Sequence, residues 1–182
     1  MNQDLLYRAT ALCASSEHCC HDLREKLRRW GATEMESEEI MDYLISEKYI
    51  DEERFCRAYA KDKMRYNHWG RLKIDQGMRM LGLDAAWRRQ ALSELPEEEY
   101  LDILTRILQS KTRSVKAKNA YDRQAKLMRF ALGRGFESSL IRDCMPEEET
   151  DEDEACPDDF DCQPCPDEDD SAYDPRHDEE DW

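Results

Sequence analysis

The sequence is punctuated by three glycines, each followed two positions later by a residue that can cap a helix. In chain order, the pairs are Gly31 with Thr33, Gly82 with Asp84, and Gly135 with Glu137. Glycine readily adopts the left-handed conformation that closes an α-helix, and an acceptor side chain two residues later can open the next helix. Because the glycines lie 51 and 53 residues apart, we predict three related units.

Apolar residues stand at matching distances before these glycines. The residues eight positions before the three glycines are Leu23, Ile74 and Leu127. The residues four positions before them are Leu27, Met78 and Ala131. Spacings of four and eight residues follow one face of an α-helix. Residues 1–145 also contain a single proline, Pro96, and a single valine, Val115, so helix breakers and strong strand formers are rare. We therefore predict an all-α fold.

The repeat spacing divides the chain into three units and a tail. The predicted limits are 1–49, 50–95 and 97–145 for the three-helix repeats, and 146–182 for the tail. Units this short bury little surface alone, so stacking on neighbours must complete the core. We expect an elongated, curved array of three tandem three-helix repeats, followed by a disordered acidic C-terminal tail.

The negative charge of the chain is concentrated in the tail. Of 43 acidic and 27 basic residues, residues 146–182 hold 19 acidic ones and one basic one, Arg176. The first 145 residues therefore hold 24 acidic and 26 basic side chains, so the net charge of −16 does not argue against a polyanionic partner. The tail could keep the protein soluble, contact a partner, or fold over a basic surface of its own chain. Tethering favours the last of these.

Two basic segments are typical of a surface that binds a polyanion or an acidic partner. The first consists of Lys61, Lys63, Arg65, Trp69, Arg71 and Lys73. The second consists of Lys111, Arg113, Lys116, Lys118, Arg123, Lys126 and Arg129, with Asp122 as the only acidic residue among them. Uncompensated Lys and Arg indicate such binding, whereas ordinary helix surfaces alternate the two signs of charge. A merely solvated face is the alternative for both segments, and Trp69 could instead fill the interface between repeats.

Eight cysteines raise the alternative of a metal site. One group of Cys and His residues lies near a predicted helix start and consists of Cys13, His18, Cys19, Cys20 and His21. The other lies in the tail and consists of Cys156, Cys162, Cys165 and His177. Neither group has the paired spacing of a zinc module, and adjacent residues of a helix point in different directions. We expect free thiols, with no bound metal or cofactor.

No sequence feature indicates catalysis, secretion or membrane insertion. A Gly-rich phosphate loop, a nucleophile elbow and a pair of catalytic acids are all lacking. The N-terminal MNQDLLYRAT lacks the basic and apolar parts of a signal peptide, and no segment has the length of a membrane span. We predict a cytoplasmic, non-enzymatic binding protein, and a monomer because no coiled-coil seam is visible.

The segment from Gly31 to Leu83 carries a specific resemblance. It contains Lys48-Tyr-Ile-Asp-Glu-Glu-Arg-Phe55, then Ala58-Tyr59, Trp69-Gly-Arg-Leu-Lys-Ile74 and Leu81-Gly-Leu83. This pattern resembles the RecX family of recombination regulators, whose signature joins a helix-ending glycine, a YIDDERFA.AY segment and a G...I...L..KG segment. The resemblance covers residues 5–145. Cys19 departs from it, because the family usually has a helix-capping serine there, and the acidic tail is not part of the family core.

The resemblance implies both a fold and a partner. RecX-like proteins are crescents of tandem three-helix repeats that lie in the groove of the RecA–DNA filament. They limit its ATP hydrolysis, strand exchange and coprotease activity, which affects recombination, DNA repair and the SOS response. A RecA filament would then be the partner, with weak contact to single-stranded DNA in addition. The alternative is a sequence-tolerant single-stranded nucleic-acid-binding protein that does not require RecA.

Within the signature, most residues have a structural interpretation. Asp51 is placed to cap a helix, and Phe55 and Tyr59 are expected in the core. Arg54 either ties the first repeat to the second or faces the partner. We favour the tie, because most charge pairs near such a seam are structural.

Overall fold

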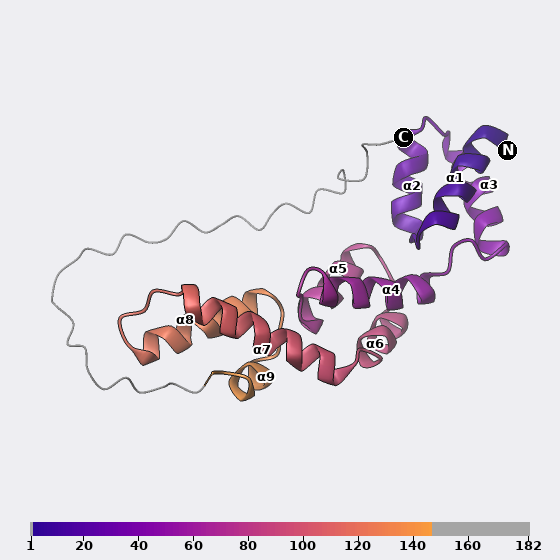
Figure 1. Ribbon diagram of the computed structural model, residues 1–182. Coiled ribbons are helices and arrows are strands. Elements are labelled where there is room, and N and C mark those ends of the chain that lie inside the picture. The colour runs from indigo at the N-terminus through magenta and orange to yellow at the C-terminus, as the bar shows by residue number, and fades with distance from the viewer. Residues whose placement is uncertain (1, 147–182) are drawn as a thin grey trace. The chain divides into compact units, whose positions relative to one another are not determined.

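The computed structural model describes residues 2–146, and all regular secondary structure in this range is α-helical (Figure 1). The helices are α1 (Gln3–Ser15), α2 (Cys20–Arg29), α3 (Glu34–Ser46), α4 (Glu52–Arg65), α5 (Arg71–Met80), α6 (Ala85–Ser93), α7 (Glu97–Ser114), α8 (Ala120–Gly133) and α9 (Ser138–Asp143). The predicted all-α fold is confirmed. The limits of the repeats and the elongated, curved form stay predictions, and the predicted disordered tail lies outside the described residues from residue 147 onward.

The three regularly spaced glycines end helices as predicted. Gly31, Gly82 and Gly135 follow α2, α5 and α8 and have φ angles of +84°, +75° and +84°. These angles lie in the left-handed region, where a side chain is strained. A left-handed glycine therefore ends the second helix in each group of three helices.

The residues two positions after the glycines all precede a helix, but they do not all cap it. Thr33 and Glu36 form a capping box at the start of α3. Asp84 opens α6 by accepting a hydrogen bond from the N–H of Ala86 at 2.7 Å. Glu137 stands before α9 without a capping bond, because its carboxylate accepts a hydrogen bond from another part of the chain.

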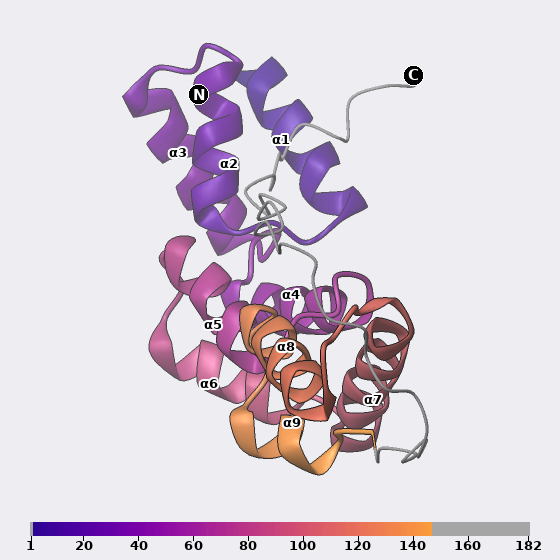
Figure 2. The same ribbon diagram turned by 90° about the vertical axis from the view of Figure 1, so that its left-hand side faces the viewer.

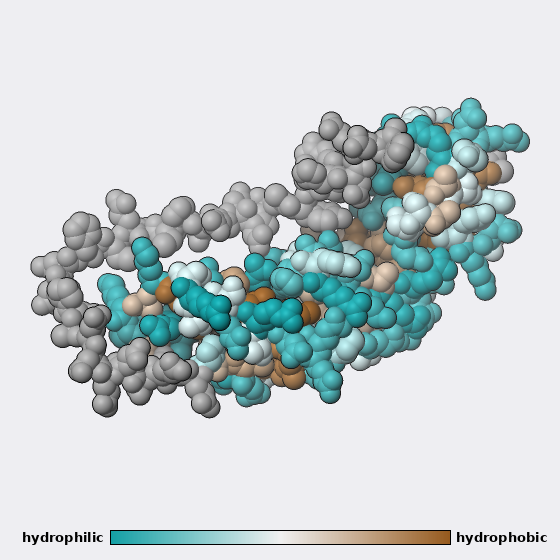
Figure 3. Space-filling model, in the orientation of Figure 1, coloured by the Kyte–Doolittle hydropathy of each residue, from teal (hydrophilic) through white to brown (hydrophobic). Residues whose placement is uncertain are grey.

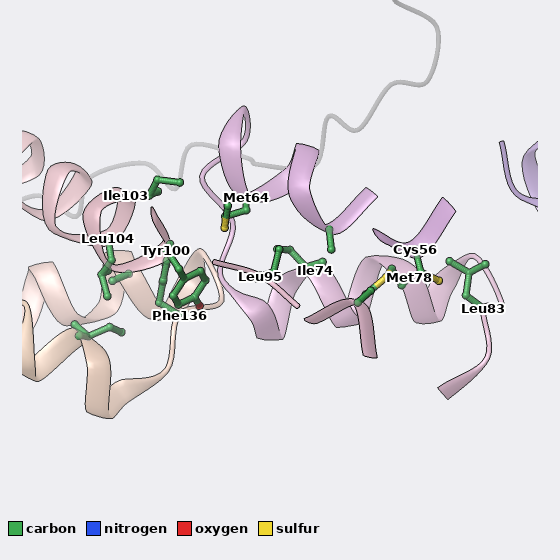
Figure 4. Packing of buried hydrophobic residues seen from close by; sticks show 14 of the residues in the cluster. Cys56, Met64, Ile74, Met78, Leu83, Leu95, Tyr100, Ile103, Leu104 and Phe136 are labelled. Atoms are coloured by element: carbon green, nitrogen blue, oxygen red, sulfur yellow. The ribbon is translucent and has the colours of Figure 1, made fainter. Parts of the chain in front are cut away.

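Buried apolar side chains form two clusters within the described residues. Helices α1–α3, which lie next to one another in Figure 2, enclose the first, with Leu5, Ala9, Leu23, Leu27, Ile40, Met41, Leu44 and Ile50. The second extends through α4–α9: Figure 4 shows Met64 and Ile74 in the same cluster as Tyr100 and Phe136. Stacking thus completes a shared core for the last six helices, whereas the first three have a core of their own.

The turn between α1 and α2 and the start of α4 are joined by an ion pair. Arg54 Nε donates to Glu17 Oε1 at 2.6 Å, so the prediction that Arg54 ties the first repeat to the second is confirmed. Asp51 caps α4 as predicted, since its side chain accepts from the Arg54 N–H at 2.9 Å. Phe55 is buried, and Tyr59 packs against the second cluster.

Two thiols are enclosed in the second cluster. Cys19 caps α2, with its Sγ accepting from the Asp22 N–H at 3.5 Å, and its side chain has no solvent exposure. Burial raises the pKa of Cys19 to about 12, although a position at a helix N-terminus by itself favours a thiolate. Burial, with the nearby charge of Glu52, raises the pKa of the equally buried Cys56 to about 11.

We therefore expect the protein to lose stability at alkaline pH through these thiols. Because the folded state holds both protons more tightly than the unfolded state, their contribution is complete below the unfolded pKa and is lost as pH rises toward the folded pKa. Above about pH 9 each thiol should lower the free energy of unfolding by about 1.4 kcal/mol per pH unit. Urea unfolding of the native chain and of a Cys19→Ser, Cys56→Ala variant measures this; equal slopes against pH would contradict the expectation.

Candidate functional site

The two arginines of the first basic segment are held by carboxylates of later helices. Arg65 on α4 donates to both oxygens of Glu99 on α7, at 2.8 and 2.9 Å. Arg71, the first residue of α5, pairs with Glu97 and lies 3.4 Å from Glu137. A bidentate arginine–carboxylate pair is a directional contact that positions both partners. These arginines therefore join the second group of helices to the third.

Trp69 lies between the lysines of the same segment. The Nζ atoms of Lys63 and Lys73 are 5.2 and 4.8 Å from its ring centroid. The indole is half-buried and packs against the second cluster, and burial lowers the pKa of Lys63. The packing of Trp69 thus supports its interpretation as part of an interior interface. Lys61, the remaining lysine of this segment, is exposed on α4.

A buried tyrosine completes the joint between these helices. Tyr100 Oη donates to Glu137 Oε2 at 2.7 Å and accepts from the Arg71 N–H at 3.0 Å. The Arg71 guanidinium lies 4.2 Å from the centroid of the Tyr100 ring. Burial, reinforced by the carboxylate of Glu137, raises the pKa of Tyr100 well above its usual value. This network explains why Glu137 does not cap α9.

The backbone is part of the same joint. Gly70 N–H donates to the carbonyl of Arg134 at 2.8 Å, and Leu72 N–H donates to the carbonyl of Gly135 at 3.0 Å. The turn before α5 and the turn after α8 therefore touch directly, main chain to main chain. The first basic segment surrounds this contact, so much of it has a structural role.

The second basic segment is arranged differently. Lys111 and Arg113 lie at the end of α7, Lys116 and Lys118 in the following turn, and Arg123, Lys126 and Arg129 on α8. All are exposed except Lys126, which is half-buried. We call these seven residues the basic surface. Figure 3 shows one face of the molecule, on which hydrophilic side chains predominate and hydrophobic areas are small.

Only one carboxylate among residues 2–146 forms an ion pair with the basic surface. Asp122 Oδ2 lies 2.8 Å from Lys126 Nζ, and this pairing lowers the pKa of Asp122. Lys111 instead lies over the ring of Phe130, at 5.1 Å from its centroid. With seven cations and one anion between positions 111 and 129, the segment keeps a net charge of +6. Exposed, uncompensated cations of this kind attract phosphate or carboxylate groups.

The structure therefore separates two segments that look alike in the sequence. The acidic residues that neutralise the first, Glu97, Glu99 and Glu137, were not recognised as partners from the sequence. Arg65 and Glu99 are 34 positions apart, and Arg71 and Glu137 are 66 apart. No local spacing rule reaches that far; the missing cap at Glu137 is visible only in three dimensions.

The described residues contain no metal-binding arrangement of three or more His, Cys, Asp or Glu side chains. Cys13, Cys19 and Cys20 are free thiols, whereas Cys156, Cys162, Cys165 and His177 lie outside the described residues. None of the helices between residues 2 and 146 combines the length and apolar character needed to cross a membrane.

Comparison with family models gives two matches. The model of the second three-helix domain of RecX matches residues 51–92, and the model of the third matches residues 97–145. The two matches include both basic segments in full.

Proteins named regulatory protein RecX are similar over most of the chain. The one from Vibrio vulnificus is 25% identical over 140 residues, which is 77% of this chain and 90% of the relative. The one from Clostridium acetobutylicum is 27% identical over 131 residues, covering 69% of this chain and 60% of the relative.

Solved structures share the fold. A crystal structure of a regulatory protein RecX superposes with a TM-score of 0.67 at 20% identity, covering 78% of this chain and 73% of the other. RecX from Lactobacillus salivarius superposes with a TM-score of 0.64 at 16% identity, covering 79% and 96%, respectively.

Proposed function

Because this chain belongs to the RecX family of regulatory proteins, we propose that it regulates the RecA recombinase by binding the RecA–DNA filament. It acts mainly as an inhibitor, limiting the ATPase, strand-exchange and coprotease activities of RecA in recombination, DNA repair and the SOS response. The protein has no chemistry of its own and works in the cytoplasm as a monomer.

The observation that carries this proposal is the basic surface on α7 and α8. Its cations are exposed and, within residues 2–146, almost without carboxylate partners. A RecA–DNA filament presents phosphates and protein side chains along a regular track, so several modest contacts can act together. A binding protein shifts the conformational equilibrium of its partner only if it binds one conformation more tightly than the other. Inhibition follows if the RecA filament conformation that this protein binds more tightly cannot hydrolyse ATP.

A second candidate function rests on the same surface. A single-stranded nucleic-acid-binding protein that does not require RecA would also use exposed cations, with stacking on aromatic residues such as Tyr121, which is 81% exposed. The two functions differ in whether RecA is needed for tight binding.

Titration of RecA-dependent ATP hydrolysis on single-stranded DNA tests the proposal. We expect hydrolysis to fall as this protein is added, and binding to a preformed RecA filament to be at least about tenfold tighter than binding to the bare strand, a gain of about 1.4 kcal/mol. The matched control measures binding to the same strand coated by a single-strand-binding protein instead of RecA. Unchanged ATP hydrolysis with equal affinity for filament and bare DNA would favour the second function.

A further inference from the structure

The acidic segment 147–182 follows helix α9 in the chain. Helix α9 packs against α8, which carries Arg123, Lys126 and Arg129, and the segment starts four residues after α9 ends at Asp143. It contains 19 carboxylates and one basic residue, Arg176. A chain of 36 residues can span up to about 120 Å when fully extended, so every residue of the basic surface is within its reach.

Most arginines of α4–α6 are already engaged by carboxylates. The arginines on α4–α6 that already pair with acidic side chains are Arg54, Arg57, Arg65, Arg71, Arg79 and Arg88. A tail carboxylate would have to displace an existing partner at each of them. On the basic surface, by contrast, only Lys126 has a carboxylate partner among residues 2–146, so new charge-assisted hydrogen bonds form there without such a loss.

We propose that the segment 147–182 docks on the basic surface of its own chain and competes there with the phosphates of a nucleic acid. The inference rests on the proposed function only in assigning both ligands to the same surface. Carboxylates and phosphates use the same Lys and Arg donors, so they exclude each other. The protein thus carries its own competitor, and a partner must displace it to bind.

The expected size of the effect follows from tethering. A tethered segment has an effective concentration of about 1 mM, and with an affinity of about 0.1 mM for the surface it weakens a competitor about tenfold. Because the contacts are exposed and ionic, the effect should fade as the salt concentration rises.

Two full-length variants test the competition. In the first, all Asp and Glu of 149–182 become Asn and Gln; in the second, the control, the order of residues in 149–182 is shuffled so that charge and length are kept. With oligothymidine as the probe at low salt, we expect the neutral variant to bind about tenfold more tightly than the native chain. The shuffled variant should bind oligothymidine with the same affinity as the native chain. At high salt the three should converge. Equal binding by the neutral variant and the native chain at low salt would overturn the proposal.

A second measurement does not depend on nucleic acid. Amide chemical shifts of the native and neutral chains, recorded by NMR, should differ at residues 111–129 and not at the paired arginines Arg65 and Arg71, independently of protein concentration. Such differences with no binding to DNA or RecA would leave the docking intact and refute the proposed function. Differences elsewhere, or ones that vanish on dilution and so report association between copies, would overturn the docking.

Discussion

Replacing Gly70 by alanine is expected to lower the free energy of unfolding by more than about 3 kcal/mol, because overpacking adds to the disruption of a buried main-chain hydrogen bond. A β-carbon at this position would lie 2.2 Å from both the carbonyl carbon and the oxygen of Gly135, and 2.3 Å from the nitrogen of Phe136. These atoms are backbone and cannot rotate away. The turn before α5 and the turn after α8 must then move apart, which breaks the hydrogen bond from Gly70 N–H to Arg134.

Other glycines of the chain provide matched controls for Gly70→Ala. Gly70 itself has an ordinary extended conformation, so only the steric clash is at issue. Gly82 has a φ of +75° and open space around it, so Gly82→Ala isolates the cost of the left-handed conformation, about 1 kcal/mol. Gly133 has neither constraint and ends α8, so Gly133→Ala should be neutral or stabilising by up to about 1 kcal/mol. Urea unfolding followed by circular dichroism ranks the three; a Gly70→Ala variant no less stable than Gly82→Ala would refute the close approach of the two turns.

Neutralising the basic surface is expected to weaken binding to the RecA–DNA filament about a hundredfold at low salt. The variant carries alanine at Arg113, Lys116, Arg123 and Arg129, none of which forms an ion pair with residues 2–146. For every phosphate of a single strand that is no longer neutralised, the slope of log K against log salt concentration should become shallower by about 0.7. Stability should change by no more than about 0.5 kcal/mol per exposed site.

The control removes the same number of positive charges elsewhere. Alanine at Arg24, Arg28, Arg89 and Arg106, all exposed, changes the net charge equally but leaves the basic surface intact. Both variants are best compared in the chain with the neutral 149–182 segment, so that tail docking does not mask the effect. If the two variants lose affinity to the same extent, net charge rather than the basic surface governs binding.

The residues at the ends of helices show how far local sequence determines this fold. Gly31, Gly82 and Gly135 could be assigned to left-handed helix ends, and Thr33 and Asp84 to helix caps, because these interactions join residues only a few positions apart. The all-α class and the repeated spacing of the helix-ending glycines follow from the same local rules.

The tie formed by Arg54 was also predictable, but its partner Glu17 was not, since they are 37 positions apart. Cys19 illustrates the same limit. The resemblance places it where a helix-capping serine is usual, and it does cap α2, yet its side chain packs in the cluster of α4–α9 rather than with α1–α3. The spacing of apolar residues along a helix indicates which of its faces is buried. Which other helix covers that face depends on tertiary packing.

By itself the sequence determined that the fold is helical, that three helices end at Gly31, Gly82 and Gly135, and that two segments are rich in cations. Tertiary structure alone decided which of those segments keeps its charge. Folding brings Glu97, Glu99 and Glu137 onto Arg65 and Arg71, and brings no such partner from residues 2–146 onto Arg113, Lys116, Arg123 or Arg129. The physical reason is range: helix formation depends on neighbours along the chain, but neutralisation of a charge depends on what lies within a few ångströms in space.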